Sequence, residues 1–482
     1  MNRATSIRRR ACTGIAIVLV ATLASSVAAA ERPSRFRMGR GVAFPGFGID
    51  PYGGWPAASP HAPRFFGNPA LLAELKPGYV RIMVAWHLLQ PARVAVPPGE
   101  DPNDPERRYA ALVRSLDGSD PIKELQAQVA AARWSADTRV FLVLMSEVPA
   151  FVTERDPVPP TPGNPRGAFP RDVSPTSEWA LLLRYLIERF SGSVWGIEIM
   201  NEPNKVRVPN RNVVYDRVVG MIETAEQLRQ GHDIRVLAPA TEDGAHAWIN
   251  YRTFTRQLLK RLDKRCDAGS CPRFLWSQHD YGDLNLRRRG IARANRVRDV
   301  VQMLACSTSR RRMPGKKNAG LRLYLTEGGV KIDQIRDAEL DDDESQDDKQ
   351  AEIVETMWRT LRNGDGGLSP TRRCQGRPPR RVTRPVELWT QYRIHDVCGD
   401  TEFQTGLTYQ FEYHRQGTEE CRLPAGGAPQ VEPCTSQYSP AGDCRTGATG
   451  IPRPQCMNAC LANPSAGPGA RRVLFETFKR LR

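Results

Sequence analysis

Two glutamates stand where acid and base chemistry would need them, each at the end of an apolar run of strand character. Glu202 ends the run that begins at Trp195, and Glu327 ends the run that begins at Leu321, about 125 positions later. Each run gives way to a Pro or Gly turn, so each carboxyl group is expected at the carboxyl end of a buried strand. The alternative for either glutamate alone is that it caps a helix or satisfies a turn.

A pair of carboxyl groups on separate strands suits one reaction in particular. Cleavage of a glycosidic bond needs one protonated carboxyl group to serve the leaving oxygen and one ionised carboxylate to attack the sugar. Mutual repulsion between Glu202 and Glu327 is expected to separate their pKa values and to keep the acid protonated. This chemistry requires no metal and no organic cofactor.

The elements that must position these residues follow a regular order. Eight short apolar runs have strand character, and most are followed by a helical pattern. Alternation of strand and helix indicates parallel strands with crossover helices, and eight units predict an α/β fold, a closed (β/α)8 TIM barrel. The strand runs are 36–44, 79–84, 139–145, 194–200, 234–238, 274–279, 321–326 and 405–411, and the helical runs are 122–134, 178–190, 213–228, 248–262, 294–304, 350–361 and 471–482.

Several insertions interrupt this pattern, and the longest is rich in cysteine. In a barrel, residues 416–468 follow the eighth strand and open on the catalytic face, either as a disulfide-braced lid or as an inert decoration. No Gly-x-Gly-x-x-Gly segment follows a strand and opens a helix, which argues against a dinucleotide enzyme. The other insertions are 97–121, 157–175, 310–317 and 364–385.

The first thirty residues are typical of a secretory signal peptide. Four arginines precede an apolar core that is too short for a membrane span, and small residues follow it. The mature chain, 31–482, is therefore expected to be secreted as one barrel with the Cys-rich insertion. No later stretch is long and apolar enough to span a membrane.

Cysteine usage agrees with export. Removal of Cys12 with the signal peptide leaves ten of the eleven cysteines, an even number in an oxidising compartment, so disulfides are expected in the C-terminal half. The nearest-neighbour pairs are Cys266 with Cys271 and Cys374 with Cys398. Metal binding is the competing interpretation, but no pair has zinc-finger spacing with following histidines.

The chain is basic, with a formal net charge of +16, or +12 without the four arginines of the signal peptide. The basic clusters lie in polar segments flanked by Pro or Gly, which indicates solvated loops. Affinity for an anionic glycan or cell surface is an open alternative. Nucleic-acid binding is not expected, because no motif alternates aromatic and basic residues.

Four motifs together resemble glycoside hydrolase clan A, the retaining (β/α)8 enzymes with catalytic glutamates on strands four and seven. Asn201-Glu202-Pro203 is similar to the acid/base motif of the clan, and Thr326-Glu327-Gly328-Gly329 to its nucleophile strand. Arg81 matches the strand-two arginine of many members, and His279 with Tyr281 matches the strand-six His-x-Tyr element. Families 5 and 39 are the most similar, and the sequence does not separate them.

This resemblance implies a role for each residue. Glu202 would be the acid/base and Glu327 the nucleophile, while Asn201 would bind the 2-hydroxyl of the sugar. Tyr281 would donate to Glu327, and the charge of Arg81 would keep that carboxylate ionised. His279 would orient a sugar hydroxyl or the neighbourhood of the nucleophile. The alternatives are an ion pair in the barrel floor for Arg81 and a satisfied core histidine for His279.

The sequence departs from the clan on the expected eighth strand, where many members carry a tryptophan beneath the reacting sugar. The run 405–411 contains no tryptophan, so Tyr409 or Phe411 is expected to take that place. Trp86 is a further candidate for stacking on a sugar face, as are Trp55 and Trp248, although Trp248 is equally suited to buried packing.

The sequence therefore predicts a secreted retaining glycosidase that acts on a poly- or oligosaccharide. The alternative is a barrel that keeps its carboxylates but acts as a secreted glycan-binding protein. The sugar, the linkage and the oligomeric state cannot be predicted from these residues.

Overall fold

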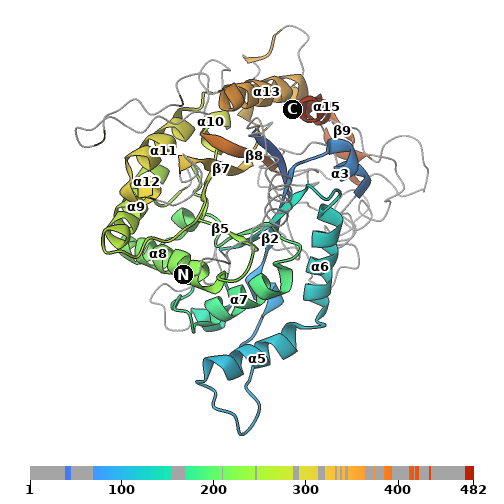
Figure 1. Ribbon diagram of the computed structural model, residues 1–482. Helices are drawn as coiled ribbons and strands as arrows, with labels where there is room; N and C mark the ends of the chain where they lie inside the picture. Colours follow the sequence, from blue (N-terminus) through green and yellow to red (C-terminus); the bar gives the residue numbers. More distant parts are fainter. Residues whose placement is uncertain are drawn as a thin grey trace, which may run out of the picture. The chain divides into compact units, whose positions relative to one another are not determined.

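The computed structural model of the chain contains a ring of parallel strands with helices outside it (Figure 1). It describes residues 38–44, 69–146, 148–153, 169–208, 210–244, 247–285, 293–312, 321–331, 334–336, 339–341, 346–363, 368, 374, 385–392, 412–416, 418–422, 434–435 and 473–481.

Eight parallel strands pair in the order β5-β4-β3-β2-β1-β8-β7-β6. A parallel bridge between Leu237 and Leu275 joins the two ends of this order, so the ring is nearly closed. The predicted (β/α)8 TIM barrel is confirmed. The strands are β1 (Gly39–Phe44), β2 (Tyr79–Val84), β3 (Arg139–Leu144), β4 (Gly196–Glu198), β5 (Arg235–Leu237), β6 (Trp276–His279), β7 (Leu323–Gly328) and β8 (Val386–Tyr392).

Helices follow the strands and cover the outside of the barrel (Figure 1). The α-helices are α3 (Pro69–Leu75), α4 (Trp86–Leu89), α5 (Pro105–Leu116), α6 (Asp120–Ala132), α7 (Glu178–Phe190), α8 (Arg211–Leu228), α9 (Tyr251–Asp267), α10 (Tyr281–Asn285), α11 (Asn295–Cys306), α12 (Thr308–Arg312), α13 (Gln346–Asn363) and α15 (Val473–Arg480). Two short 3-10 helices, η1 (Ala150–Val152) and η2 (Pro203–Lys205), lie in loops after strands.

Strand alternation divides the core into two parts. On β2, Val80, Ile82 and Val84 pack in the large cluster between barrel and helices, whereas Tyr79 and Met83 pack in two smaller clusters inside the barrel. Because successive side chains of a strand point to opposite faces, Arg81 lies inside the barrel between Tyr79 and Met83. The lower cluster is Tyr79, Phe141, Leu237, Tyr324 and Leu388, and the upper cluster is Ala43, Met83, Val143, Tyr281 and Tyr392.

The eighth strand is not the predicted one. The structure forms β8 from Val386–Tyr392, which pairs with β1 and β7, while 405–411 lies outside the described residues. The prediction failed because β8 carries Glu387, Thr390 and Gln391 and so lacks the continuous apolar run expected of a strand buried on both faces.

A helix missed in the sequence lies within the expected insertion 97–121. Asp104 caps α5 by accepting from the Glu106 backbone N–H at 2.9 Å, and Pro105 takes the first helical position. The apolar positions of α5 recur at helical spacing, with Tyr109, Leu112 and Leu116 buried. The Pro, Asp and Arg content of this segment suggested a loop, although both signals for the start of a helix, Asp104 and Pro105, are present in the sequence.

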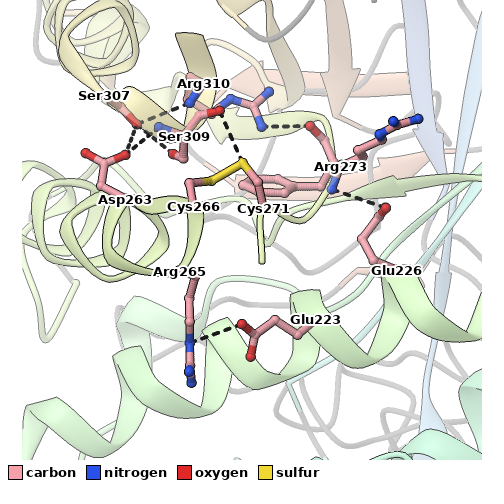
Figure 2. The surroundings of a disulfide bond; sticks show 11 residues. Glu223, Glu226, Asp263, Arg265, Cys266, Cys271, Arg273, Ser307, Ser309 and Arg310 are labelled. Atoms are coloured by element: carbon pink, nitrogen blue, oxygen red, sulfur yellow. Dashed lines mark hydrogen bonds and ion pairs between the residues drawn. A yellow bond between two sulfur atoms is a disulfide. The ribbon is translucent and has the colours of Figure 1, made fainter. Parts of the chain in front are cut away.

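Two disulfides join segments that lie outside the barrel strands. The predicted pair Cys266 with Cys271 is confirmed and closes the turn between α9 and β6 (Figure 2). The predicted pair Cys374 with Cys398 is wrong, because Cys374 bonds to Cys306 at the end of α11. Sequence proximity could not identify a partner 68 positions away. A disulfide that closes so long a loop stabilises a fold by about 4 kcal/mol in the chain-entropy description.

Polar contacts reinforce the region of the Cys266–Cys271 disulfide (Figure 2). The carboxylate of Asp263 accepts from the Ser307 hydroxyl at 2.6 Å and from the Ser309 backbone at 2.7 Å, which joins α9 to α12. Arg310 is 1% exposed and donates to the Phe274 carbonyl at 2.8 Å. Burial lowers the pKa of Arg310 to about 9.

Parts of the predicted domain organisation lie outside the described residues. These are the expected signal peptide and most of the Cys-rich insertion, so the domain division stays a prediction. At the start of the insertion, β10 (Thr418–Arg422) pairs antiparallel with the preceding β9 (Glu412–Gln416) and with β11 (Cys434–Thr435). None of the helices in the described ranges has the length and apolar character of a membrane span.

Candidate active site

Glu327 is held at the carboxyl end of β7 by two donors. It is 4% exposed, forms an ion pair with Arg81, and accepts from the Tyr281 hydroxyl at 3.1 Å. The next residue must be glycine, because a Cβ at Gly328 would lie 1.9 Å from the Asp280 carboxylate. Glu327 is therefore held by Arg81 of β2 on one side and by Tyr281, which follows β6, on the other.

Arg81 connects both halves of the site from the middle of β2. Its guanidinium is fully buried and donates to Glu327, to Glu198 Oε1 at 3.2 Å and to Asn201 Oδ1 at 2.8 Å. Burial alone would lower the pKa of Arg81, but the carboxylates of Glu327 and Glu198 raise it. A buried charge needs such partners, and the removal of one leaves the others uncompensated.

Glu202 follows β4 in a strained conformation. Asn201 still bridges to Ala240 in the manner of a strand, and Glu202 then adopts left-handed angles, φ 43° and ψ 52°. Such angles are uncommon for a residue other than glycine, and Pro203 disfavours the right-handed helical alternative for the residue before it. Strain of this kind gathers at functional sites, where the surrounding structure enforces it.

A lysine and a histidine contact Glu202. Lys205 Nζ lies 2.7 Å from Oε2, and His279 Nδ1 donates to Oε1 at 2.8 Å. Burial would raise the pKa of Glu202, but the charge of Lys205 and the hydrogen bond from His279 outweigh it, and the pKa is lowered. The expectation that mutual repulsion keeps this acid protonated is wrong, because it omitted Lys205.

His279 lies between the two glutamates at the end of β6. It is fully buried, and Nδ1 is 3.6 Å from Glu327 Oε2 as well as within hydrogen-bond distance of Glu202. Burial lowers the pKa of His279, but the carboxylates of Glu327 and Glu202 raise it overall. The ring therefore serves as a donor between two carboxylates.

One possible metal-ligand atom from each of Glu202, His279 and Glu327 lies within 4.8 Å of the others. This spacing is compatible with a metal ion, but the charges oppose it. Arg81 and Lys205 already contact the two carboxylates, and His279 donates to one of them through the nitrogen that faces both. A divalent cation would be repelled by these groups, so the arrangement suits acid and base chemistry better.

Asn201 is oriented by Arg81. Its Oδ1 accepts from the guanidinium, which leaves the amide N–H groups to donate elsewhere, and the residue is 5% exposed. An amide held in this way is suited to donate to a substrate hydroxyl beside Glu202. The structure thus brings together Asn201, Arg81, His279 and Tyr281 around the two glutamates.

Three further residues of the site were missed in the sequence. Glu198 is fully buried in β4 and pairs with Arg81. A charged residue inside an apolar strand run signals a buried ion pair, so this one could have been found. Lys205 and Asn204 follow the acid/base motif in polar positions that also suit an ordinary loop, and no sequence signal distinguished them.

The predicted aromatic contacts change in the structure. Trp86 is 1% exposed, packs edge-on against Phe151 and donates to Gln90 at 3.0 Å, so its surroundings support a packing role. Tyr409 and Trp55 lie outside the described residues. On the observed β8, Trp389 faces the helices and Tyr392 lies inside the barrel. The strand therefore offers Tyr392 as its aromatic residue near the site.

No protein-family model matches the chain, and no curated protein matches it. Among solved structures, a family 39 glycoside hydrolase from the gut symbiont Bacteroides cellulosilyticus WH2 is similar over 77% of this chain, with 15% identity and a TM-score of 0.40, and this chain spans 60% of its length. XacCel5A in complex with cellopentaose is 14% identical over 80% of this chain and 97% of its own, with a TM-score of 0.40. An endo-β-1,4-glucanase from Xanthomonas axonopodis pv. citri is 14% identical over 79% of this chain and 95% of its own, with a TM-score of 0.42.

Proposed function

We propose that this protein is a glycoside hydrolase that cleaves an O-glycosidic bond of a poly- or oligosaccharide by double displacement. The observation that carries the proposal is the approach of Glu202 and Glu327, whose facing carboxylate oxygens lie within 4.8 Å at the carboxyl ends of two barrel strands. Carboxyl groups about 5 to 5.5 Å apart suit retention, whereas an inverting reaction needs about 6.5 to 9.5 Å to admit a water molecule.

In the first step, Glu327 attacks the anomeric carbon and the bond from that carbon to the glycosidic oxygen breaks. Glu202 gives its proton to the departing oxygen, so the leaving group departs as a neutral alcohol. Arg81 and Tyr281 keep the attacking carboxylate oriented. Asn201 would donate to the 2-hydroxyl of the bound sugar, a contact that strengthens in the transition state.

In the second step, a water molecule replaces the departed alcohol. Glu202, now ionised, accepts a proton from this water while the oxygen attacks the anomeric carbon and Glu327 leaves. Both residues return to their starting states. His279 would stabilise each carboxylate in turn, because its Nδ1 lies near both.

The contact between Lys205 and Glu202 must open for this cycle to begin. An ionised Glu202 cannot donate a proton, and Lys205 holds it ionised at 2.7 Å. The Lys205 side chain is 41% exposed, so it is free to move toward solvent or toward a substrate group. We therefore propose that substrate entry separates the pair and permits protonation of Glu202.

The test compares the wild type with Glu327→Gln and Glu202→Gln on a panel of glycosides and polysaccharides. Wild-type turnover should follow retention, with the first-formed anomer identified by NMR before mutarotation. Glu327→Gln should reduce turnover by at least about 10⁴-fold, since it removes the nucleophile. Glu202→Gln should cost about 10² to 10⁴-fold, the usual contribution of acid/base catalysis, and less on substrates with an activated leaving group. Retained activity in Glu327→Gln would refute the proposal.

The ion pair of Lys205 with Glu202 also favours a second candidate function. A barrel whose acid/base stays ionised would bind a glycan without cleaving it. In that case, the wild type would be inactive across the panel and retained on an insoluble glycan, and Glu327→Gln would not change that retention.

We also propose that the protein acts outside the cytoplasm. Two disulfides support this, since such bonds persist in oxidising compartments. Recovery of the protein from culture medium, with an amino terminus near residue 31, would test the proposal directly.

A further inference from the structure

One large apolar side chain among the described residues is exposed rather than buried. Trp248 is 41% exposed and lies in the loop after β5, at the same end of the barrel as Glu202 and Glu327. The guanidinium carbons of Arg207 and Arg211 lie 5.6 and 5.2 Å from the centre of its ring. Contacts of this kind hold an indole ring in place. We call Trp248, Arg207 and Arg211 the rim patch.

The two arginines of the rim patch keep their charges available. Within the described part of the chain, neither has a carboxylate at ion-pair distance, whereas nearby Arg261 pairs with Asp216 at 2.6 Å and Arg265 with Glu223 at 3.1 Å. Arg211 also opens α8, whose first turn holds no acidic residue. A positive charge there opposes the helix dipole, so this placement does not serve the stability of α8.

The rim patch is attached rigidly to the loop that carries Glu202. The buried Asn204 amide donates to the Glu242 carbonyl at 2.7 Å and to the Ile249 carbonyl at 3.1 Å, and it accepts from the Glu242 backbone at 2.9 Å. Ile249 N–H donates in return to the Asn204 carbonyl at 2.9 Å. Asn204 follows Glu202 by two positions, and Ile249 adjoins Trp248, so these bonds fix the patch relative to the glutamate.

Chain connectivity keeps the basic groups close to that glutamate. Lys205 contacts Glu202 directly, and Arg207 follows Lys205 by two positions, a span of about 7 Å in extended chain. Positive charge therefore extends outward from Glu202 along its own loop to the exposed indole. Because Glu202 would protonate the departing oxygen, this loop borders the side of the leaving group.

We propose that the rim patch is a subsite for an anionic sugar residue of the substrate, on the leaving-group side of the cleaved bond. The indole stacks on a pyranose face, and the two guanidinium groups bind the carboxylate of a uronic acid or a sulfate ester. This inference rests on the proposed glycosidase function and adds the class of substrate to it.

The experiment measures binding of glycans to the full chain carrying Glu327→Gln, which stops turnover. The probes are oligosaccharides of equal length: neutral cello-oligosaccharide, its form oxidised to the uronate, oligogalacturonate and a sulfated galactan oligosaccharide. We expect at least one acidic probe to bind about tenfold or more tightly than the neutral one, a difference of about 1.4 kcal/mol. Added salt should weaken that binding, since exposed charges are screened. Comparison of the uronate and sulfate probes identifies the anionic group.

Variants then assign the binding to the patch. Trp248→Ala and the pair Arg207→Gln with Arg211→Gln should each weaken the acidic probe about tenfold or more. The pair Arg114→Gln with Arg256→Gln removes the same charge from exposed positions on α5 and α9 and should change nothing. Thermal unfolding of every variant shows that each remains folded.

Three results would overturn the subsite. Acidic probes could bind no better than the neutral one, the Arg114 and Arg256 pair could weaken them equally, or a DNA oligonucleotide could bind as well with no effect of Trp248→Ala. The last result would indicate a general polyanion surface. Failure of the glycosidase proposal is separate, because it would appear as absent wild-type turnover while binding to the rim patch persists.

Discussion

Glu327 and Glu202 each contact a cation, but the two cations are held in different ways. Arg81 is fully buried in β2 and has Glu198 and Asn201 as further partners, so it cannot leave Glu327 without exposing other charges. Lys205 belongs to the short helix η2, and its side chain is 41% exposed. One carboxylate has a permanent counterion, and the other has a releasable one.

The two glutamates also differ in their backbone conformation. Glu327 lies within β7 and is followed by a glycine that admits Asp280, whereas Glu202 adopts a left-handed conformation outside β4. The proposed roles require such a division. A nucleophile stays ionised until it attacks, while an acid/base must gain and lose a proton in each cycle. We call the surroundings of Glu327 and the surroundings of Glu202 the two walls of the site, and mutations can test whether these walls differ in this way.

The largest effect is expected from Arg81→Met. It leaves Glu198 and Glu327 without their buried counterion, which should lower the free energy of unfolding by about 3 to 5 kcal/mol. Any folded protein should lose at least about 100-fold in kcat/KM. Denaturant unfolding and kinetics on the folded fraction provide the measurement.

A matched control is Arg310→Met, which removes a second fully buried arginine that lies on α12, outside the barrel strands. It should lower stability but leave kcat/KM of the folded protein near the wild-type value. If Arg81→Met behaved in the same way, Arg81 would be a structural ion pair and would not belong to the site.

A smaller effect is expected from Asn204→Ala. It removes the three side-chain hydrogen bonds that join the loops after β4 and β5. We expect stability to fall by roughly 1 to 3 kcal/mol, and kcat/KM to fall by up to about 100-fold as Glu202 moves from its position. Asn285→Ala is the counterpart on the other wall, where Asn285 bonds the carbonyls of Tyr281 and Gly329. It should affect kcat/KM less, because Arg81 still holds Glu327.

The wall of Glu327 could be predicted from sequence more fully than the wall of Glu202. Strand ends are marked by an apolar run and a turn, so Glu327, Tyr281 and Arg81 were placed correctly on β7, after β6 and on β2. Lys205 was missed because its contact with Glu202 depends on the fold of a 3-10 turn. Loop geometry is not encoded in hydrophobic periodicity.

The same reasoning explains where the fold prediction failed. Seven strands were found because they are apolar, whereas β8 was missed because Glu387, Thr390 and Gln391 interrupt its apolar pattern. The partner of Cys374 was unpredictable, since the disulfide to Cys306 joins segments whose proximity follows from the helix packing. Local sequence patterns thus predict most of the strands, whereas the eighth strand and the disulfide partner of Cys374 depend on long-range packing.

Tyr281→Phe changes the wall of Glu327 and should have a moderate effect on kcat/KM. It removes one hydroxyl donor, 3.1 Å from Glu327, while the ion pair with Arg81 remains. Loss of a hydrogen bond to a charged group is worth about 1.5 kcal/mol or more, so we expect kcat/KM to fall about tenfold. Tyr324→Phe, in the lower cluster of the barrel, is the control and should leave kcat/KM unchanged.

The smallest change in rate, but the most direct test of the comparison, is expected from Lys205→Met. Stability should change little, because Lys205 is itself 41% exposed and His279 still contacts the buried Glu202. Lys205 lowers the pKa of Glu202, so its removal should raise that pKa. Because the proposed acid must be protonated, activity is lost as pH rises through this pKa, and the basic limb of the kcat/KM profile should move to higher pH by about one unit or more. A shift to lower pH, or none, would show that Lys205 does not control the acid, and the two walls would then differ in structure but not in function.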